Sequence, residues 1–235
     1  LIQQMLKEVE QRGTNATVGA SGINGGDLVM LEVQLLDTLD DRTAVLKRVQ
    51  QGIRSYPNHK DLRYFYARKL IGDKKFPEAR DQFAQLIAQY PGDGDLLYSL
   101  ALISLEINMP DDAKSYLQRL LLTGQRLDDA HYYLGLIDTQ QNHTDLAIEH
   151  YQKVRSGPNL LQALRNLTQL MVRAGRLDDI HSYLQNIRFR SPDLNITLLA
   201  LEANILIDEK RYEVARTLLD GSVSSYPNSS QCVRC

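Results

Sequence analysis

The sequence predicts an all-α protein, an α-solenoid of antiparallel helix pairs, and three observations lead to that prediction. The phrase Asp-x-x-Tyr begins at Asp61, Asp95 and Asp129, a constant spacing of about 34 residues that is typical of stacked helical repeats. Five of the seven prolines keep nearly the same interval if one unit without a proline lies between the second and the third: Pro57, Pro91, Pro158, Pro192 and Pro227. Apolar residues recur at the helical spacing of three and four, not at the strand spacing of two.

Each unit holds two helices of roughly 12–14 residues, an ordinary length in globular proteins. The first helix shows one apolar face, for example Leu97, Leu100, Ala101 and Leu105. Pro110 then opens the second helix, because the first helical turn tolerates a missing N–H. Elsewhere Gly175 ends a helix and reverses the chain.

Small residues mark where the two helices of a unit come close together. In the first helices they are Ala67, Ala101, Gly135 and Ala203. In the second helices they are Ala79, Ala113, Ala147 and Ala215. A large side chain at such a contact would push the helices apart and cost about 1–3 kcal/mol.

The stretch 130–159 resembles the tetratricopeptide repeat family. Leu134, Gly135 and Ala147 match the family pattern, and Tyr151 stands for its Phe. The departures are His131 for Trp, Asp138 for Tyr, and Pro158 one residue early. The resemblance covers about residues 27–227 and is weakest in the first unit. It implies a right-handed superhelix of roughly six helix pairs.

The flanks of the repeats differ in composition. Residues 1–12 carry an apolar helical stripe and are expected to form the end of a preceding repeat; the stripe is Ile2, Met5, Leu6 and Val9. Residues 13–26 contain five glycines and are expected to form a flexible loop. Residues 228–235 fall where a further, truncated repeat begins.

In this family the first helix of each pair lines the inner, concave groove. Carried over, the resemblance places these residues there: Tyr64, Phe65, Arg68, Tyr98, Tyr132, Tyr133, Arg165, Asn166, Gln169, Arg173 and Asn204. Tyrosine is enriched at protein interfaces, although such rings also fill space between helices. The aspartates at 61, 95 and 129 are expected to complement helix dipoles.

The second half of the predicted groove is basic and polar. Arg165, Asn166, Gln169 and Arg173 share one helical stripe, where two guanidinium groups could hold a carboxylate or phosphate; a plain solvated surface is the alternative. Together the halves suit an extended peptide with apolar side chains and an acidic group. The family members that clamp a terminal carboxylate use Lys and Asn at positions held here by Asp61, Tyr64, Asp95 and Tyr98, which argues against that activity.

Composition excludes several function classes. The 27 basic residues nearly balance the 29 acidic residues, which argues against a broad nucleic-acid or anionic-membrane footprint. No uncharged stretch reaches the ~18 residues needed to span a bilayer. No phosphate loop, nucleophile elbow or paired-carboxylate signature is present, so neither an enzyme nor a cofactor is expected. The five histidines form no ligand cluster by spacing, and Cys232 with Cys235 supplies only half of a zinc site.

These features predict a non-enzymatic adaptor or scaffold that binds a protein or peptide in its groove. The stretches that begin at Asp61 and Gly94 are also similar to repeat-bearing lipoproteins of Gram-negative bacteria. Some of these deliver substrates to a C-terminal processing protease, which implies a protease partner and a periplasmic, outer-membrane-anchored location; a cytoplasmic location is the alternative. Two other functions stay open: a subunit that packs on itself or a copy, and a repeat protein with a zinc domain beginning at Cys232.

Overall fold

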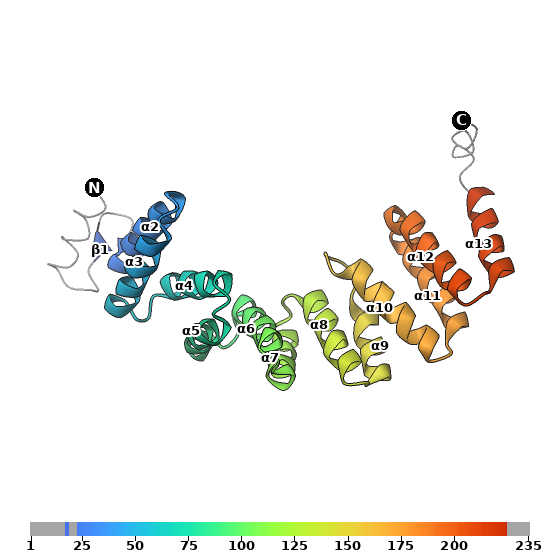
Figure 1. Cartoon of the computed structure of the whole chain (residues 1–235), viewed down its shortest axis with the longest axis horizontal. Coiled ribbons are helices and arrows are strands. Elements are labelled where there is room, and N and C mark those ends of the chain that lie inside the picture. Colours follow the sequence, from blue (N-terminus) through green and yellow to red (C-terminus); the bar gives the residue numbers. More distant parts are fainter. Residues whose placement is uncertain (1–16, 19–22, 225–235) are drawn as a thin grey trace, which may run out of the picture. The chain divides into compact units, whose positions relative to one another are not determined.

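The computed structural model describes residues 17–18 and 23–224, and Figure 1 shows their order along the chain. Twelve α-helices occur within these residues, and they pack as consecutive pairs joined by short turns. The prediction of an all-α solenoid of helix pairs is confirmed. None of these helices is both long enough and apolar enough to cross a membrane.

The chain divides into two compact units, residues 1–130 and 131–235. The helices of the first are α2 Gly25–Thr38, α3 Arg42–Ser55, α4 Lys60–Gly72, α5 Phe76–Gln89, α6 Gly94–Glu106 and α7 Pro110–Thr123. Helix α8, Leu127–Gln140, begins in the first unit and continues into the second. The rest are α9 Thr144–Lys153, α10 Leu160–Arg173, α11 Leu177–Arg190, α12 Asn195–Asp208 and α13 Tyr212–Ser224, with a 3₁₀ turn at Pro192–Leu194.

A short strand pairing precedes the helices. Strand β1, Thr17–Val18, pairs antiparallel with β2, Ile23–Asn24. The sequence pattern predicts no sheet, so this pairing of two residues on each side is an exception to it. Helix α2 then begins at Gly25, two residues before the predicted start of the repeats, because Asn24 and Asp27 form a reciprocal capping box. The predicted helix 1–12, most of the predicted loop 13–26 and the predicted repeat start 228–235 lie outside the described residues.

The turn inside each helix pair contains one residue with positive φ. These residues are Asp40, Lys74, Asn108, Asn142, Gly175 and Lys210, with φ between 57° and 70°. A left-handed residue after a helix lets the chain reverse while its N–H groups bond to the last turn. Gly175 is the strongest such signal in the sequence, because it has no Cβ atom, and Asn108 and Asn142 are weaker ones.

The predicted close contacts are present at the small residues. Ala67 and Ala101 are fully buried, as are Ala79, Ala113 and Ala147. A Cβ atom on Gly135 would lie 2.7 Å from the buried Tyr151 ring. Thr168 is buried at the equivalent position one unit after Gly135, where the repeat is shorter by a single residue. The sequence pattern alone does not single Thr168 out as a close-contact residue.

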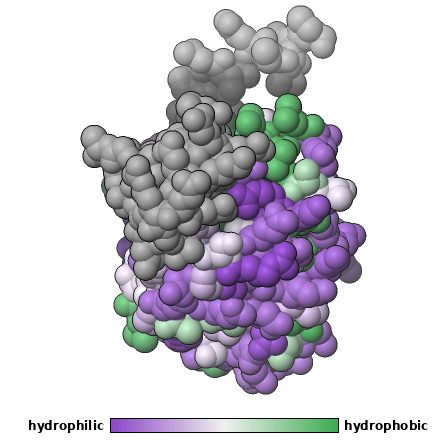
Figure 2. Space-filling view, turned by 90° about the vertical axis from the view of Figure 1, so that its left-hand side faces the viewer, coloured by the Kyte–Doolittle hydropathy of each residue, from purple (hydrophilic) through white to green (hydrophobic). Residues whose placement is uncertain are grey.

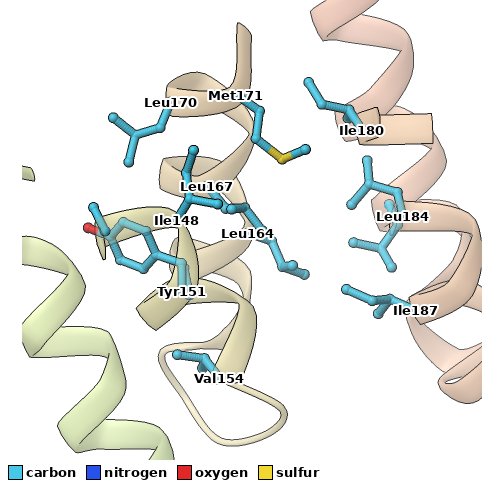
Figure 3. Packing of buried hydrophobic residues seen from close by; sticks show 13 residues of the cluster. Ile148, Tyr151, Val154, Leu164, Leu167, Leu170, Met171, Ile180, Leu184 and Ile187 are labelled. Carbon is cyan, nitrogen blue, oxygen red and sulfur yellow. The ribbon is translucent and has the colours of Figure 1, made fainter. Parts of the chain in front are cut away.

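The core of the second unit joins successive helices, and Figure 3 labels its residues from α9, α10 and α11. Tyr151 and Ile148 come from α9, and Leu164, Leu167 and Met171 come from α10. On the opposite side α11 contributes Ile180, Leu184 and Ile187. Each helix therefore buries side chains against the next pair, which is how stacked repeats bury a continuous core.

Ion pairs link neighbouring repeats, and each joins two residues that stand about one repeat apart in the sequence. They are Lys69–Asp37, Arg42–Asp73, Lys60–Asp93, Arg80–Asp112, Arg126–Asp95 and Arg211–Asp178. A hydrogen bond to Asp93 raises the pKa of Lys60 against the opposing effect of burial. Burial alone would raise the pKa of Asp93, but the hydrogen bonds from Lys60 and the Leu96 N–H outweigh it and lower that pKa. The repeats are thus joined by charge as well as by apolar packing.

Candidate functional site

A hollow of about 450 Å³ lies between α4 and α6 in the first unit. We call it the α4–α6 pocket. Its lining residues are Ile71, Gly72, Lys74, Phe76, Tyr98, Ser99, Leu102, Ile103 and Glu106. The walls are mainly apolar, with Lys74 and Glu106 as the charged groups. This volume lies within the ~300–1,000 Å³ that ligand pockets occupy.

Tyr98 is the residue of the predicted groove that lines this pocket, and Arg126 holds its ring. The Arg126 guanidinium lies 4.7 Å from the ring centroid, a cation–π distance. Arg126 Nε donates to Asp95 at 2.8 Å, and its Nη1 donates to Asp129 at 3.1 Å. The hydrogen bond to Asp95 is the main cause that raises the pKa of Arg126. Two aspartates of the recurring phrase therefore fix the cation that faces one of its tyrosines.

The other predicted aromatic residues of the first unit pack against neighbouring helices of that unit. The Tyr64 ring meets Phe83 edge-on, with centroids 5.4 Å apart. Phe65 packs against the buried cluster of α2, α3 and α4, and the Lys69 ammonium lies 5.1 Å from its ring. Arg68 is exposed. Tyr64 and Phe65 thus have structural contacts that the sequence pattern alone does not reveal.

In the second unit the predicted tyrosines are also half-buried. Tyr132 contacts Tyr133 at 5.1 Å and Tyr151 at 6.3 Å between ring centroids. Burial raises the pKa of Tyr132, and the neighbouring Tyr133 and Tyr151 add to the increase. These three rings form an aromatic cluster that links α8 to α9.

The polar stripe of α10 is only partly available to a partner. Arg165, Gln169 and Arg173 are exposed. The Asn166 amide donates to the Tyr151 hydroxyl at 3.2 Å, and its oxygen accepts from Gln162 at 2.9 Å. Asn166 therefore supports the Tyr151 ring, and the two arginines are the charged members of the stripe. Asn204 is exposed on α12.

The structure brings together histidines that are far apart in sequence. The Nδ1 atoms of His131 and His150 lie 3.1 Å apart, and His150 Nε2 lies 3.6 Å from the buried carboxylate of Asp138. His143 Nδ1 approaches the same carboxylate at 3.4 Å. The sequence spacing does not reveal these contacts, which form only when α8 and α9 pack together. Within the described part of the chain, no group of three or more His, Cys, Asp or Glu residues is placed to hold a metal ion.

A second hollow, of about 500 Å³, lies among α11, α12 and α13. Glu202 on its wall is buried where other first helices place Leu100 or Leu167. Its carboxylate accepts from His181 Nδ1 and from Arg188 Nη1, both at 2.5 Å. Both carboxylate oxygens thus have partners, and the pair with Arg188 offsets the cost of burying the charge. Glu202 is not predicted from the sequence, because its neighbours come from another helix.

Comparison with known proteins finds a family match for part of the chain. Residues 70–136 match the model of the tetratricopeptide repeat. This match supports tetratricopeptide-type repeats over these residues. A curated relative, TPR repeat-containing protein PA4667 of Pseudomonas aeruginosa, is 32% identical over 101 residues. That match covers 43% of this chain and 17% of the relative, so the chain spans a small part of the relative's length.

Several solved structures share the fold at low sequence identity. A MamA structure aligns with a TM-score of 0.61 at 18% identity, covering 72% of this chain and 93% of MamA. YrrB, described as a TPR protein with an unusual peptide-binding site, aligns with a TM-score of 0.54 at 17% identity, covering 76% and 92%. PilW, a type IV pilus biogenesis factor, gives 0.54 at 16% identity, covering 86% and 94%.

Proposed function

We propose that the chain is a non-enzymatic interaction module that binds an extended peptide segment of a partner protein. The α4–α6 pocket is the observation that carries this proposal. It lies on the first helices, has apolar walls and is large enough for one bulky side chain. A peptide would place an apolar anchor there and continue along the neighbouring repeats.

Two features of the pocket favour a peptide over a small charged ligand. Leu102 and Tyr98 are one helical turn apart, so they present a continuous apolar strip on α6. Lys74 and Glu106 carry opposite charges, so the pocket has no net charge to select a small ion. Interface hot spots are typically such apolar pockets filled by one anchor and surrounded by polar residues.

The exposed arginines of α10 supply the second part of the proposal. Arg165 and Arg173 are two turns apart on one helix and would attract an acidic group of the partner. The pocket of the first unit therefore suits a large apolar residue, and the arginines of the second unit suit an acidic residue. The other residues of the predicted groove act mainly by supporting the helices that carry these surfaces; they are Tyr64, Phe65, Tyr133 and Asn166.

Adaptor activity for a periplasmic processing protease is the more specific form of this proposal. It rests on the similarity of the stretches that begin at Asp61 and Gly94 to repeat-bearing bacterial lipoproteins. The test is whether the chain, immobilised, retains both a C-terminal processing protease and that protease's substrate. If the immobilised chain retains neither the protease nor its substrate, the adaptor role is wrong, while the peptide-binding proposal is unaffected.

The peptide proposal is tested by selecting binders from a displayed library of short peptides. A photoreactive phenylalanine analogue at Ser99 in the pocket should crosslink the selected peptides. The same analogue at Leu122 is the control, since this residue is 89% exposed on α7 and lies outside the pocket lining. Equal crosslinking at both positions, or none at Ser99, would place the peptide elsewhere.

A further inference from the structure

Two histidines and a buried aspartate meet between α8 and α9. The Asp138 side chain is 0% exposed, and its carboxylate lies 3.6 Å from His150 Nε2. His150 Nδ1 in turn lies 3.1 Å from His131 Nδ1. We call His131 and His150 the α8–α9 histidine pair. Charged groups usually stay in water, as on the mainly hydrophilic face that Figure 2 shows, so a buried carboxylate beside two titratable rings is unusual.

The neighbouring repeats place other residues at the positions of this pair. Each has a leucine in the first helix and a tyrosine in the second: Leu97 with Tyr116 one period earlier, and Leu164 with Tyr183 one period later. Both leucines are fully buried. The position of Asp138 is held there by Ser104 and Met171. The repeat formed by α8 and α9 therefore has groups that titrate near neutral pH where its neighbours have none.

The geometry of the pair decides how many protons it can hold. When both rings are neutral, His131 Nδ1–H can donate to His150 Nδ1, while His150 Nε2–H points to Asp138. When one proton is added, His150 becomes the cation beside the carboxylate, and its Nδ1–H donates to His131 instead. A second added proton would place two Nδ1–H groups and two positive charges against each other at 3.1 Å. The closed contact therefore accepts one added proton but not two.

The surrounding charges do not remove this conflict. His143 Nδ1 lies 3.4 Å from Asp138 and, once protonated, competes for the same carboxylate. Glu149 is exposed, and the hydrogen bond from Lys153 is the main cause that lowers its pKa, with smaller effects of the two histidines. The other charged residues of α8, α9 and α10 are Asp128, Asp129, Asp145, Arg165 and Arg173. An acid nearby can attract a proton to one ring, but it cannot relieve the clash between two Nδ1–H groups.

We propose that the α8–α9 histidine pair is an acid-sensitive contact, which is closed at neutral pH and opens when both histidines are protonated. An open segment binds one proton at each histidine below about pH 6.5, whereas the closed pair binds one in total. The open state therefore binds more protons, so the closed state loses stability as the pH falls. For one extra proton, the opening constant rises about tenfold for each pH unit below about pH 6.

Hydrogen–deuterium exchange on the whole chain measures this opening constant, once the intrinsic pH dependence of exchange is removed. Between pH 7 and pH 5 the opening constant of α8–α9 should rise by about tenfold or more. The α6–α7 pair contains no histidine and is the internal control, which should change by less than about threefold. An opening constant of α8–α9 that changes no more than that of α6–α7 overturns the proposal.

Two variants show whether the histidine pair causes the effect. His131→Leu removes the site of the second proton, so the ratio of the opening constants at pH 5 and pH 7 should fall to about that of α6–α7 or below, whatever the stability at pH 7. His143→Gln is the matched control, because His143 contacts Asp138 but lies outside the pair, and it should keep the acid effect. If His131→Leu keeps the effect, or if His143→Gln abolishes it, the pair is not the acid-sensitive contact.

Histidine NMR signals give a second measurement that needs no variant. As the pH falls from 7.5 to 5, the closed chain should show only one of the two rings taking up a proton. Protonation of the other ring should coincide with the loss of the native signals of α8 and α9. If both rings become protonated while those helices keep their native signals, the proposal is wrong.

Discussion

Gly135 and Tyr151 show how a single small residue sets the distance between two helices. The Tyr151 ring is fully buried, and its hydroxyl bonds to Thr139 and Asn166 at 3.2 Å. A Cβ atom on Gly135 would lie 2.7 to 3.0 Å from three ring atoms. The ring cannot move away without breaking these hydrogen bonds, so the glycine is required by packing.

We predict that Gly135→Ala lowers the free energy of unfolding by about 1–3 kcal/mol, the usual cost of overpacking. Gly72→Ala is the control, because nothing lies within 4 Å of a Cβ atom there. That variant should be neutral or more stable by up to about 1 kcal/mol, since alanine favours the helix. Urea denaturation of the two variants measures both effects. Equal stability of Gly135→Ala and the parent would contradict the close contact.

A second prediction at this scale concerns the Lys60–Asp93 ion pair. Lys60→Met should lower the free energy of unfolding by about 0.5–1 kcal/mol at neutral pH. The expected loss is small because the Lys60 side chain is 38% exposed and water screens the ion pair. Lys47→Met, at an exposed lysine of α3, serves as the control and should cost less. The free energy of unfolding of the parent and of both variants is measured at several pH values.

The pH dependence follows from the two shifted pKa values. The pKa of Lys60 is raised above 10.5, so its contribution is complete below 10.5 and is lost as the pH rises through the raised value. The pKa of Asp93 is lowered below 3.8, so its contribution is present above 3.8 and is lost as the pH falls through the lowered value. The cost of Lys60→Met should therefore shrink at both extremes, and a cost that is constant across the whole range would argue against this pair.

At the scale of single elements, the turns within the helix pairs depend on a left-handed residue. Asn142 has φ of 60°, and its N–H bonds to Thr139 O at 3.2 Å. Asparagine tolerates this conformation better than branched residues do, because its short polar side chain can bond locally. In other repeats the same turn position is held by Asp40, Lys74, Asn108 and Lys210. Only Gly175 has the glycine that adopts positive φ without strain.

We predict that Asn142→Val destabilises the α8–α9 pair by about 1–2 kcal/mol, because a branched residue is strained at positive φ. Asn142→Gly should retain stability or increase it. Thermal melts followed by circular dichroism compare the two variants directly. A valine variant that melts with the parent would mean that this turn adopts another conformation.

The elements were predictable from sequence wherever local chemistry fixes them. The repeat period and the small residues predict the helix pairs, because close helix contacts recur once in each repeat. Pro110 marks the start of α7, because it acts within the first turn. The positive-φ turns were predicted only at Gly175, since asparagine and aspartate give a weaker signal for that conformation and lysine gives none. The strand pairing of Thr17–Val18 with Ile23–Asn24 was missed because two residues are too few to show alternation.

At the scale of the whole molecule, the site was less predictable than the fold. Tyr98 was expected to face a partner and does line the α4–α6 pocket. Ile71 and Phe76 were not expected, because the pocket wall combines a helix end with the start of the next helix. The contact between His131 and His150 was missed for a similar reason, since it joins side chains from two different helices.

The charged stripe of α10 yields a prediction about partner binding. Arg165→Ala with Arg173→Ala should weaken binding of a selected acidic peptide, and more strongly at low salt, because salt screens exposed charges. Arg216→Ala is the control, since this exposed arginine lies on a second helix, α13. Peptide affinity measured at two salt concentrations distinguishes an electrostatic contact from a loss of fold. An effect that is equal at both concentrations would exclude charge attraction by this stripe.

The affinity of a selected apolar peptide for a pocket variant tests the central claim, peptide binding through the first helices, most directly. Leu102→Asp places a charge on the wall of the α4–α6 pocket, and Leu122→Asp makes the same change at an exposed leucine of α7. Isothermal titration should show a loss of roughly thirtyfold for Leu102→Asp, corresponding to a hot-spot cost of about 2 kcal/mol. Leu122→Asp should bind as the parent does. If Leu102→Asp folds as the parent and binds the peptide with unchanged affinity, the pocket does not hold the partner and the proposed function is wrong.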